Sequence, residues 1–184
     1  LSGVDVFFHL AGIAHQQAPA SAYEALNYRA TERLARLASA AGVGGFVFLS
    51  SVKAMGSSTA LHKRSENECT VPGDPYGLSK WHAECALQQI FSGDEMSVVI
   101  LRPALVYGPD AKGNLRALAS GIRWGLPRPP ERGARSMIAV QDLVALLCVI
   151  AQRPPVGVHQ WIACGSHSYS TRAIYDLIRA ASRK

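Results

Sequence analysis

The chain has 184 residues, of which 48% are hydrophobic and 17% are charged. This composition is typical of a globular protein and excludes disordered and fibrous classes. No run approaches the roughly 20 apolar residues of a membrane span, and the first residues lack a signal-peptide pattern. We therefore expect a cytoplasmic protein with no membrane partner, while the net charge of +6 calls for an anionic partner or for none.

The first predicted strand runs from Val4 to Leu10 and is hydrophobic enough to be a buried parallel strand. Ala11 and Gly12 end it. A long amphipathic helix is predicted from 19 to 41, where Gly42 stops it. Its apolar positions recur at helical spacing: Ala22, Leu26, Ala30, Leu34, Leu37 and Ala41. The polar Asn27 on this helix is either an amide in solvent or a functional residue.

A second buried strand, 46–49, leads into Ser50 and Ser51. In a parallel sheet, active-site groups collect at the carboxyl ends of the strands, which is where these two serines lie. The polar loop 56–73 is long enough to be a functional covering segment. A third strand, 97–101, follows the next predicted helix. This alternation predicts an α/β fold with a parallel sheet and right-handed crossovers.

After residue 109 glycine, proline and arginine become frequent, which predicts a second, smaller lobe. We expect a first domain over 1–109 and a second over 110–184. The second has predicted helices and a strand at about 114–124, 141–152, 158–163 and 170–182. A basic excess falls in this region: Lys112, Arg116, Arg123, Arg128, Arg132 and Arg135. It fits a phosphate-bearing small molecule or a solvated surface, whereas nucleic acid is disfavoured because aromatic residues do not interleave with the arginines.

The four cysteines show no Cys-x-x-Cys spacing: Cys69, Cys85, Cys148 and Cys164. The last three lie in apolar runs, where buried thiols are usual. Cys164 and His167 have a ligand-like separation but no second pair to complete a site. We expect neither a disulfide nor a metal site.

Tyr76 and Lys80 stand four residues apart after a proline-set turn at Pro75. A helix that begins there places both side chains on one face. A nearby ammonium favours the phenolate, so the pKa of Tyr76 is expected to move towards neutrality and let the phenol exchange a proton. Alone, the pair decides nothing, because the same spacing arises by chance on surface helices.

Four short sequence motifs, in a characteristic order and spacing, carry a resemblance to a known family. They are His9-Leu10-Ala11-Gly12, Phe48-Leu49-Ser50-Ser51 with Gly56, Tyr76-Gly77-Leu78-Ser79-Lys80, and Leu101-Arg102-Pro103 with Val106-Tyr107-Gly108-Pro109. With them the chain resembles the extended short-chain dehydrogenase/reductases, in particular the NAD-dependent epimerase/dehydratase group that acts on nucleotide sugars. The resemblance implies a Rossmann-like, doubly wound parallel sheet with a smaller C-terminal substrate lobe.

The resemblance also implies roles for individual residues. Tyr76 would transfer the proton, Lys80 would lower its pKa and hold the nicotinamide ribose, and Ser51 would bind the reacting oxygen of the sugar. The cofactor, NAD or NADP, would be bordered by Ala11, Gly12, Asn27 and Pro103, together with Tyr76 and Lys80. The implied substrate is a nucleotide sugar, and a UDP-hexose in particular. Arg135 would approach its diphosphate.

One difference from the family's dehydratases narrows the range of possible reactions. The dehydratases carry Asp and Glu directly after the hydroxyl residue, where this chain has Val52 and Lys53. We therefore expect a C4 epimerase or a 4-keto-sugar reductase, with Lys53 either contacting the substrate or lying on the surface. The alternative is a non-catalytic sensor or scaffold of the same fold. The presence of Ser51, Tyr76 and Lys80 together favours the enzyme.

The second departure concerns the cofactor. Family members open with a strand, a glycine-rich turn and a helix that bind its pyrophosphate, and about sixty to seventy residues of that kind are expected before Leu1. The residue that distinguishes NAD from NADP lies there too. We expect a fragment that by itself neither retains NAD(P) nor turns over substrate, and that is poorly soluble because strand 4–10 keeps an unpaired edge. The intact protein is expected to be a homodimer, joined through the helix of residues 21–41 and the Tyr76 helix.

Overall fold

The computed structural model describes residues 1, 3–14, 18–57, 62–109 and 113–182. It divides into two compact units, one made of residues 1–103 and 145–163, the other of 104–144 and 164–184. The sequence predicts two consecutive segments that meet at residue 109. In the structure the chain instead returns to the first unit, because strand 158–163 pairs with the first unit's sheet.

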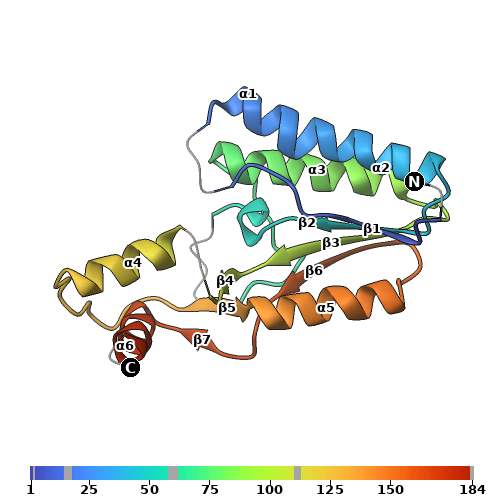
Figure 1. Ribbon diagram of the computed structural model, residues 1–184. Coiled ribbons are helices and arrows are strands. Elements are labelled where there is room, and N and C mark those ends of the chain that lie inside the picture. Colours follow the sequence, from blue (N-terminus) through green and yellow to red (C-terminus); the bar gives the residue numbers. More distant parts are fainter. Residues whose placement is uncertain (2, 15–17, 58–61, 110–112, 183–184) are drawn as a thin grey trace. The chain divides into compact units, whose positions relative to one another are not determined.

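The first unit contains a four-stranded parallel sheet in the order β1-β2-β3-β6 (Figure 1). Its strands are β1 (Val6–His9), β2 (Gly45–Leu49), β3 (Ser97–Pro103) and β6 (Val158–Ala163). The register pairs Phe7 with Phe46, and Phe46 with Val98. These strands confirm the predicted parallel α/β architecture. Their carboxyl ends lie at one edge of the sheet, where the polar residues that follow β1 and β2 are brought together.

One face of this sheet is covered by two long helical segments (Figure 1). The first consists of α1 (Ala20–Tyr23), a π-helical turn η1 (Glu24–Arg29) and α2 (Ala30–Ala40), and the second is α3 (Pro75–Phe91). Gly42, with a φ of 73°, ends α2 in the left-handed region that glycine tolerates. Asp74 begins α3 because its Oδ1 accepts the backbone N–H of Gly77 at 3.0 Å, directly before Pro75.

The buried side of the first helical segment differs from the predicted one. Leu26 and Leu37, expected on the apolar face, are each 52% exposed, whereas Asn27 and Thr31 are 0% exposed. The buried polar pair is satisfied internally, since the Thr31 hydroxyl donates to the carbonyl of Asn27 at 2.8 Å and bonds His9 Nε2 at 2.8 Å. Hydrogen bonds to β1 and its loop, rather than apolar periodicity, therefore select the face that packs inward.

The core of the first unit lies between the sheet and these helices. Phe46 and Phe48 from β2 and Ile100 from β3 are 0% exposed and pack with Leu87 of α3 and Ala35 of α2. Each is apolar and removed from water, so the cluster supplies the main stabilisation of the unit. The carboxyl end of β2 is thereby held on a rigid base.

Beyond β2 the chain forms a short 3₁₀ helix, η2 (Val52–Met55), and then the predicted covering loop. Arg64 pins the described part of this loop by donating to the carbonyl oxygens of Met55 at 2.6 Å and Gly56 at 3.0 Å. Gly56 has a φ of 71°, and a Cβ there would lie 2.2 Å from the Thr70 carbonyl oxygen, so only glycine fits.

The second unit contains a three-stranded sheet in the order β4-β5-β7. Its elements are β4 (Leu105–Tyr107), α4 (Asn114–Arg123), β5 (Arg135–Ala139), β7 (Ser168–Tyr169) and α6 (Thr171–Ala181), with the start of α5 (Val140–Gln152). The predicted helices are confirmed to within a residue or two at their ends. Part of the basic excess is neutralised locally, since Arg128 Nε donates to Asp176 Oδ1 at 2.8 Å.

The prediction of buried thiols is wrong. All four cysteines are exposed and none is in a disulfide, because the apolar run around a cysteine does not decide whether its own side chain faces the core. Among the described residues no three His, Cys, Asp or Glu side chains are grouped as a metal site, and no helix in that part of the chain is long and apolar enough to cross a membrane.

Candidate active site

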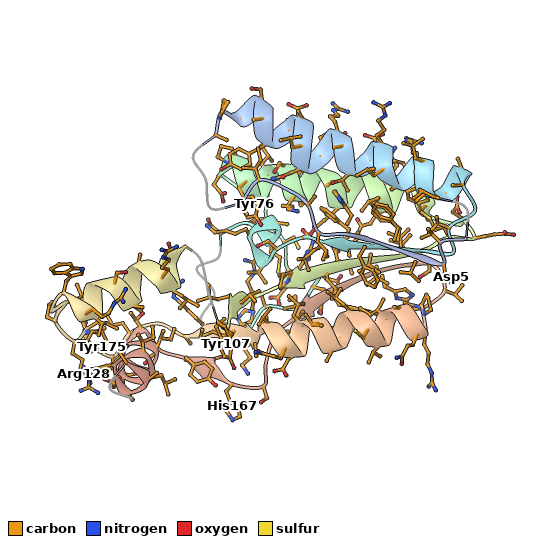
Figure 2. The ribbon with its side chains drawn as sticks, in the orientation of Figure 1. Asp5, Tyr76, Tyr107, Arg128, His167 and Tyr175 are labelled. Atoms are coloured by element: carbon orange, nitrogen blue, oxygen red, sulfur yellow. The ribbon has the colours of Figure 1, made fainter. Side chains whose placement is uncertain are left out.

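Ser51 and Tyr76 lie together beyond the carboxyl end of β2. Ser51 caps η2, its Oγ accepting the backbone N–H of Lys53 at 3.2 Å, and its side chain lies near enough to the Tyr76 phenol to affect its ionisation. Tyr76 stands in the first turn of α3 (Figure 2) and is half-buried, with its ring 6.2 Å from that of Tyr23. The structure thus brings the two hydroxyl-bearing residues of the expected site together.

The ionisation of Tyr76 differs from the expectation. Burial raises the pKa of its phenol, and the nearby Asp74 and Tyr23 raise it further, while the Ser51 side chain opposes them. Lys80 is not among the groups that shift this pKa. In the structure as it stands Tyr76 is a neutral phenol, because desolvation outweighs the favourable effect of Ser51 on the phenolate.

Lys80 is buried and its ammonium is engaged with β2. Its Nζ donates to the carbonyl oxygen of Leu49 at 2.9 Å and lies 4.5 Å from the centre of the Phe48 ring. Burial lowers the pKa of Lys80 to about 8, and the carboxylate of Glu84 counteracts part of that effect. Lys80 is therefore poised to change its charge close to working pH.

Asn27 ties the loop after β1 to α3. Its Oδ1 accepts the backbone N–H of Ile13 at 2.7 Å, and its Nδ2 donates to the Ile13 carbonyl at 3.0 Å and to Ser79 Oγ at 3.1 Å. The Ser79 hydroxyl in turn donates to the carbonyl oxygen of Tyr76 at 2.8 Å. Asn27 is thus a buried structural hub at the candidate site, which rules out the solvent-exposed amide. It lies in the π-helical turn, a feature that often marks functional positions.

Gly12 sits against both Asn27 and Lys80. A Cβ at this position would lie 2.8 Å from Asn27 Oδ1 and 3.4 Å from Lys80 Nζ, so a larger residue would displace one of them. Ala11, beside it, is exposed. The expected cofactor residues Ala11, Gly12, Asn27 and Lys80 are therefore gathered at one place beyond β1 and β2.

The three remaining residues expected at the site lie on other elements. Pro103 is buried at the end of β3 and pairs with Ala163 of β6. Lys53 is exposed, with its Nζ 3.9 Å from Asp74 Oδ2. Arg135 is exposed on β5, in the second unit.

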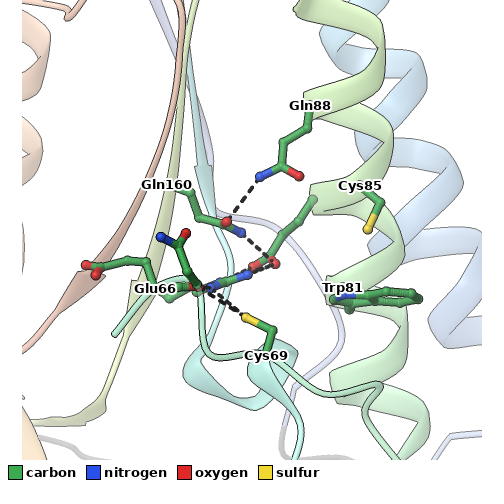
Figure 3. Close-up of a pocket in the computed structure, with 9 residues that line it drawn as sticks. Glu66, Cys69, Trp81, Cys85, Gln88 and Gln160 are labelled. Carbon is green, nitrogen blue, oxygen red and sulfur yellow. Dashed lines mark hydrogen bonds and ion pairs between the residues drawn. The ribbon is translucent and has the colours of Figure 1, made fainter. Parts of the chain in front are cut away.

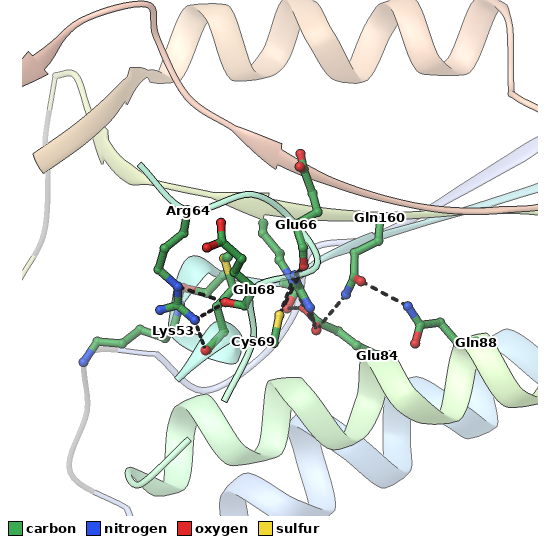
Figure 4. A network of polar contacts seen from close by, with 12 residues as sticks. Lys53, Arg64, Glu66, Glu68, Cys69, Glu84, Gln88 and Gln160 are labelled. Carbon is green, nitrogen blue, oxygen red and sulfur yellow. Dashed lines mark hydrogen bonds and ion pairs between the residues drawn. The ribbon is translucent and has the colours of Figure 1, made fainter. Parts of the chain in front are cut away.

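Sequence reasoning assigned no role to a buried polar network between α3 and the sheet, one turn beyond Lys80 (Figure 4). Arg102 Nη2 donates to Glu84 Oε2 at 2.7 Å, and Ser50 Oγ donates to Glu84 Oε1. Arg102 also donates to the carbonyl of Glu66 at 2.9 Å, which ties the covering loop to β3. The available signal was the position of Glu84 one turn after Lys80, together with a charged residue at the end of a buried strand.

A pocket of about 280 Å³ lies beside this network (Figure 3). Its walls include Glu84, Arg102, Cys69, Cys85 and Gln160, and none of the candidate catalytic residues. Its polar atoms bond one another, as in the contact of Gln160 Nε2 with Glu84 Oε2 at 2.9 Å. The pocket therefore belongs to the margin of this network and not to the centre of the candidate chemistry.

The chain is similar to known proteins over most of its length. Residues 1–163 match the model of the NAD dependent epimerase/dehydratase family. The chain belongs to this family. It is 32% identical over 182 residues to the UDP-glucose 4-epimerase of Vibrio cholerae, a match that covers 93% of this chain and 55% of that protein. It is 31% identical over 128 residues to N-acetyl-alpha-D-glucosaminyl-diphospho-ditrans,octacis-undecaprenol 4-epimerase of Escherichia coli O157:H7, covering 68% of this chain and 38% of that one.

Proteins of known structure share the fold of this chain. UDP-glucuronic acid 4-epimerase from Bacillus cereus, in complex with NAD, superposes with a TM-score of 0.84 at 20% identity, covering 99% of this chain and 61% of that one. MoeE5 in complex with UDP-glucose and NAD gives 0.81 at 24% identity, covering 99% and 64%. The sheet of the first unit is therefore Rossmann-like. The matches cover less than two thirds of the length of each protein named here.

Proposed function

We propose that the protein, at its full length, is an NAD(P)-dependent enzyme that acts at C4 of a nucleotide sugar, as a 4-epimerase or a 4-keto-sugar reductase. The observation that carries the proposal is the proximity of the Ser51 and Tyr76 side chains at the carboxyl end of β2, with the Lys80 ammonium buried one turn behind. A binding module needs no such arrangement of proton-exchanging groups.

The residues present fit the nicotinamide end of the cofactor. Gly12 keeps the backbone beyond β1 close to Asn27 and Lys80, and Lys80 supplies donors suited to ribose hydroxyls. When bound, the nicotinamide would supply the hydride acceptor and donor. We propose that the first unit holds this group and that the second unit, through Arg135, binds the diphosphate of the substrate.

We assign proton transfer to Tyr76, assisted by Ser51. Ser51 would hold the reacting oxygen of the sugar, and Tyr76 would exchange a proton with it. Because burial keeps Tyr76 protonated, the phenol starts as a general acid, which suits reduction of a 4-keto group directly. In the epimerase, the Lys80 ammonium would have to move towards the phenol oxygen so that Tyr76 can also accept a proton.

The substrate class follows from the relatives and the absent carboxylates. The similar proteins named above include a UDP-glucose 4-epimerase, which makes a UDP-hexose the preferred substrate. Val52 and Lys53 replace the acid and base that dehydration needs. Lys53 would approach the substrate only by leaving Asp74, from which it is 3.9 Å away.

The proposal is tested by using proton NMR to monitor the amounts of UDP-glucose and UDP-galactose in the presence of the full-length protein and NAD. Interconversion of the two supports the epimerase. Consumption of NAD(P)H with a UDP-4-keto-hexose, without interconversion, supports the reductase. If neither reaction occurs while UDP-sugar still binds, the enzyme proposal fails in favour of the sensor or scaffold.

A further inference from the structure

The contact between Lys80 and Phe48 has a specific geometry. The Lys80 Nζ lies 4.5 Å from the centre of the Phe48 ring, within the range of a cation–π interaction. Phe48 is 0% exposed and Lys80 is 4% exposed, so little water competes with the contact. An ammonium desolvated in this way interacts more strongly with a ring face than an exposed one does.

The other groups around the Lys80 ammonium are a backbone carbonyl and two titratable side chains. Lys80 Nζ has three N–H donors, and it donates one hydrogen bond to the Leu49 carbonyl oxygen at 2.9 Å. The charged and titratable groups that interact with Lys80 are Glu84 on its own helix and His9 on β1. His9 is stacked on Phe48 with ring centres 5.7 Å apart, and its pKa is lowered to about 4, so it is neutral wherever Lys80 titrates.

We propose that the ring of Phe48 is a positioning residue for Lys80, a π-face platform that holds the ammonium charged at the carboxyl end of β2. The proposal rests on the function proposed above only for the use made of Lys80. The Leu49 carbonyl fixes one direction of the Nζ and the Phe48 ring supports another, so the ammonium is kept beside Gly12 and Asn27.

β2 supplies a matched control. Phe46 is also 0% exposed and lies two residues earlier on the same face of β2, but its ring contacts are with Phe7 and His9. Replacing either phenylalanine by 3,4,5-trifluorophenylalanine keeps the ring while withdrawing electrons from its face. This change enlarges the ring only slightly, and it avoids the cavity, and the water such a cavity could admit, that Phe48→Leu would create.

The experiment measures the titration of Lys80 by NMR of labelled lysine side chains in the full-length protein, with the signal assigned by Lys80→Met. We expect the fluorinated ring at 48 to lower the pKa of Lys80 by about half a pH unit to one pH unit, and the same ring at 46 to leave it unchanged. Equal shifts from both positions, or none from 48, would overturn the proposal. Turnover is measured separately, so a shifted titration in a protein with no turnover at all would refute the proposed function and leave this contact standing.

Discussion

The Arg102 guanidinium and the Glu84 carboxylate form an ion pair sealed from water, with side chains 2% and 1% exposed and Nη2 2.7 Å from Oε2. We predict that Arg102→Met lowers the free energy of unfolding by about 3 to 5 kcal/mol, because it leaves a buried carboxylate without its cation. Urea unfolding measures the change. The control is Arg36→Met, which breaks the exposed Arg36–Glu32 pair and should change stability by less than about 1 kcal/mol. Equal effects of the two variants would contradict this account.

The buried His9 makes stability depend on pH. Burial, followed by the charge of Lys80, lowers the pKa of His9 from 6.5 to about 4, so the folded state favours the neutral ring. Its contribution is complete above about pH 6.5 and is lost as the pH falls towards 4, because the unfolded chain binds the proton more readily. We expect a loss of roughly 2 to 3 kcal/mol over this window. Most carboxylates titrate lower, so the upper part of the window isolates His9.

The measurement is urea unfolding between pH 4.5 and 7 for three proteins. His9→Gln, which can still bond the Thr31 hydroxyl, should flatten the dependence. His167→Gln, which alters a histidine exposed in the second unit, should leave it as in the wild type. A wild-type stability that does not vary between pH 5 and 7 would refute the buried, neutral His9.

The exposed leucines of the first helical segment support the expected homodimer. Leu26 and Leu37 are each 52% exposed, so this helical segment does not bury these two leucines against its own sheet. We predict that Leu26→Lys with Leu37→Lys weakens self-association at least tenfold, because the cations would be buried at the interface without partners. Sedimentation at micromolar concentration measures it, with Val156→Lys, 93% exposed in a loop, as control. A monomeric wild type would exclude this mode of assembly.

Hydrophobic patterns and strand ends predicted the parallel sheet and the position of Ser51 beyond β2. Alternating strands and helices implied the sheet, and Ser51 was singled out because active groups of parallel sheets collect at the carboxyl ends of strands. The inward face of the helix over 20–40 could not be predicted, because hydrogen bonds of Asn27 and Thr31 outweigh the burial of leucines. The pKa of Tyr76 was misjudged for a similar reason. The spacing to Lys80 is local, whereas the desolvation of Tyr76 and the bond from Lys80 to Leu49 arise only in the folded protein.

The most direct test of the account is Tyr76→Phe in the full-length protein, assayed with NAD(P) and a UDP-hexose. The substitution removes the proton-exchanging hydroxyl and keeps the ring, so we expect kcat to fall at least about 100-fold while UDP binding is nearly unchanged. Tyr28→Phe is the control, since the Tyr28 hydroxyl accepts from Arg29 on the helix surface and should leave turnover intact. Retention of more than about a tenth of the wild-type rate by Tyr76→Phe would contradict the assignment of Tyr76 as the acid and base.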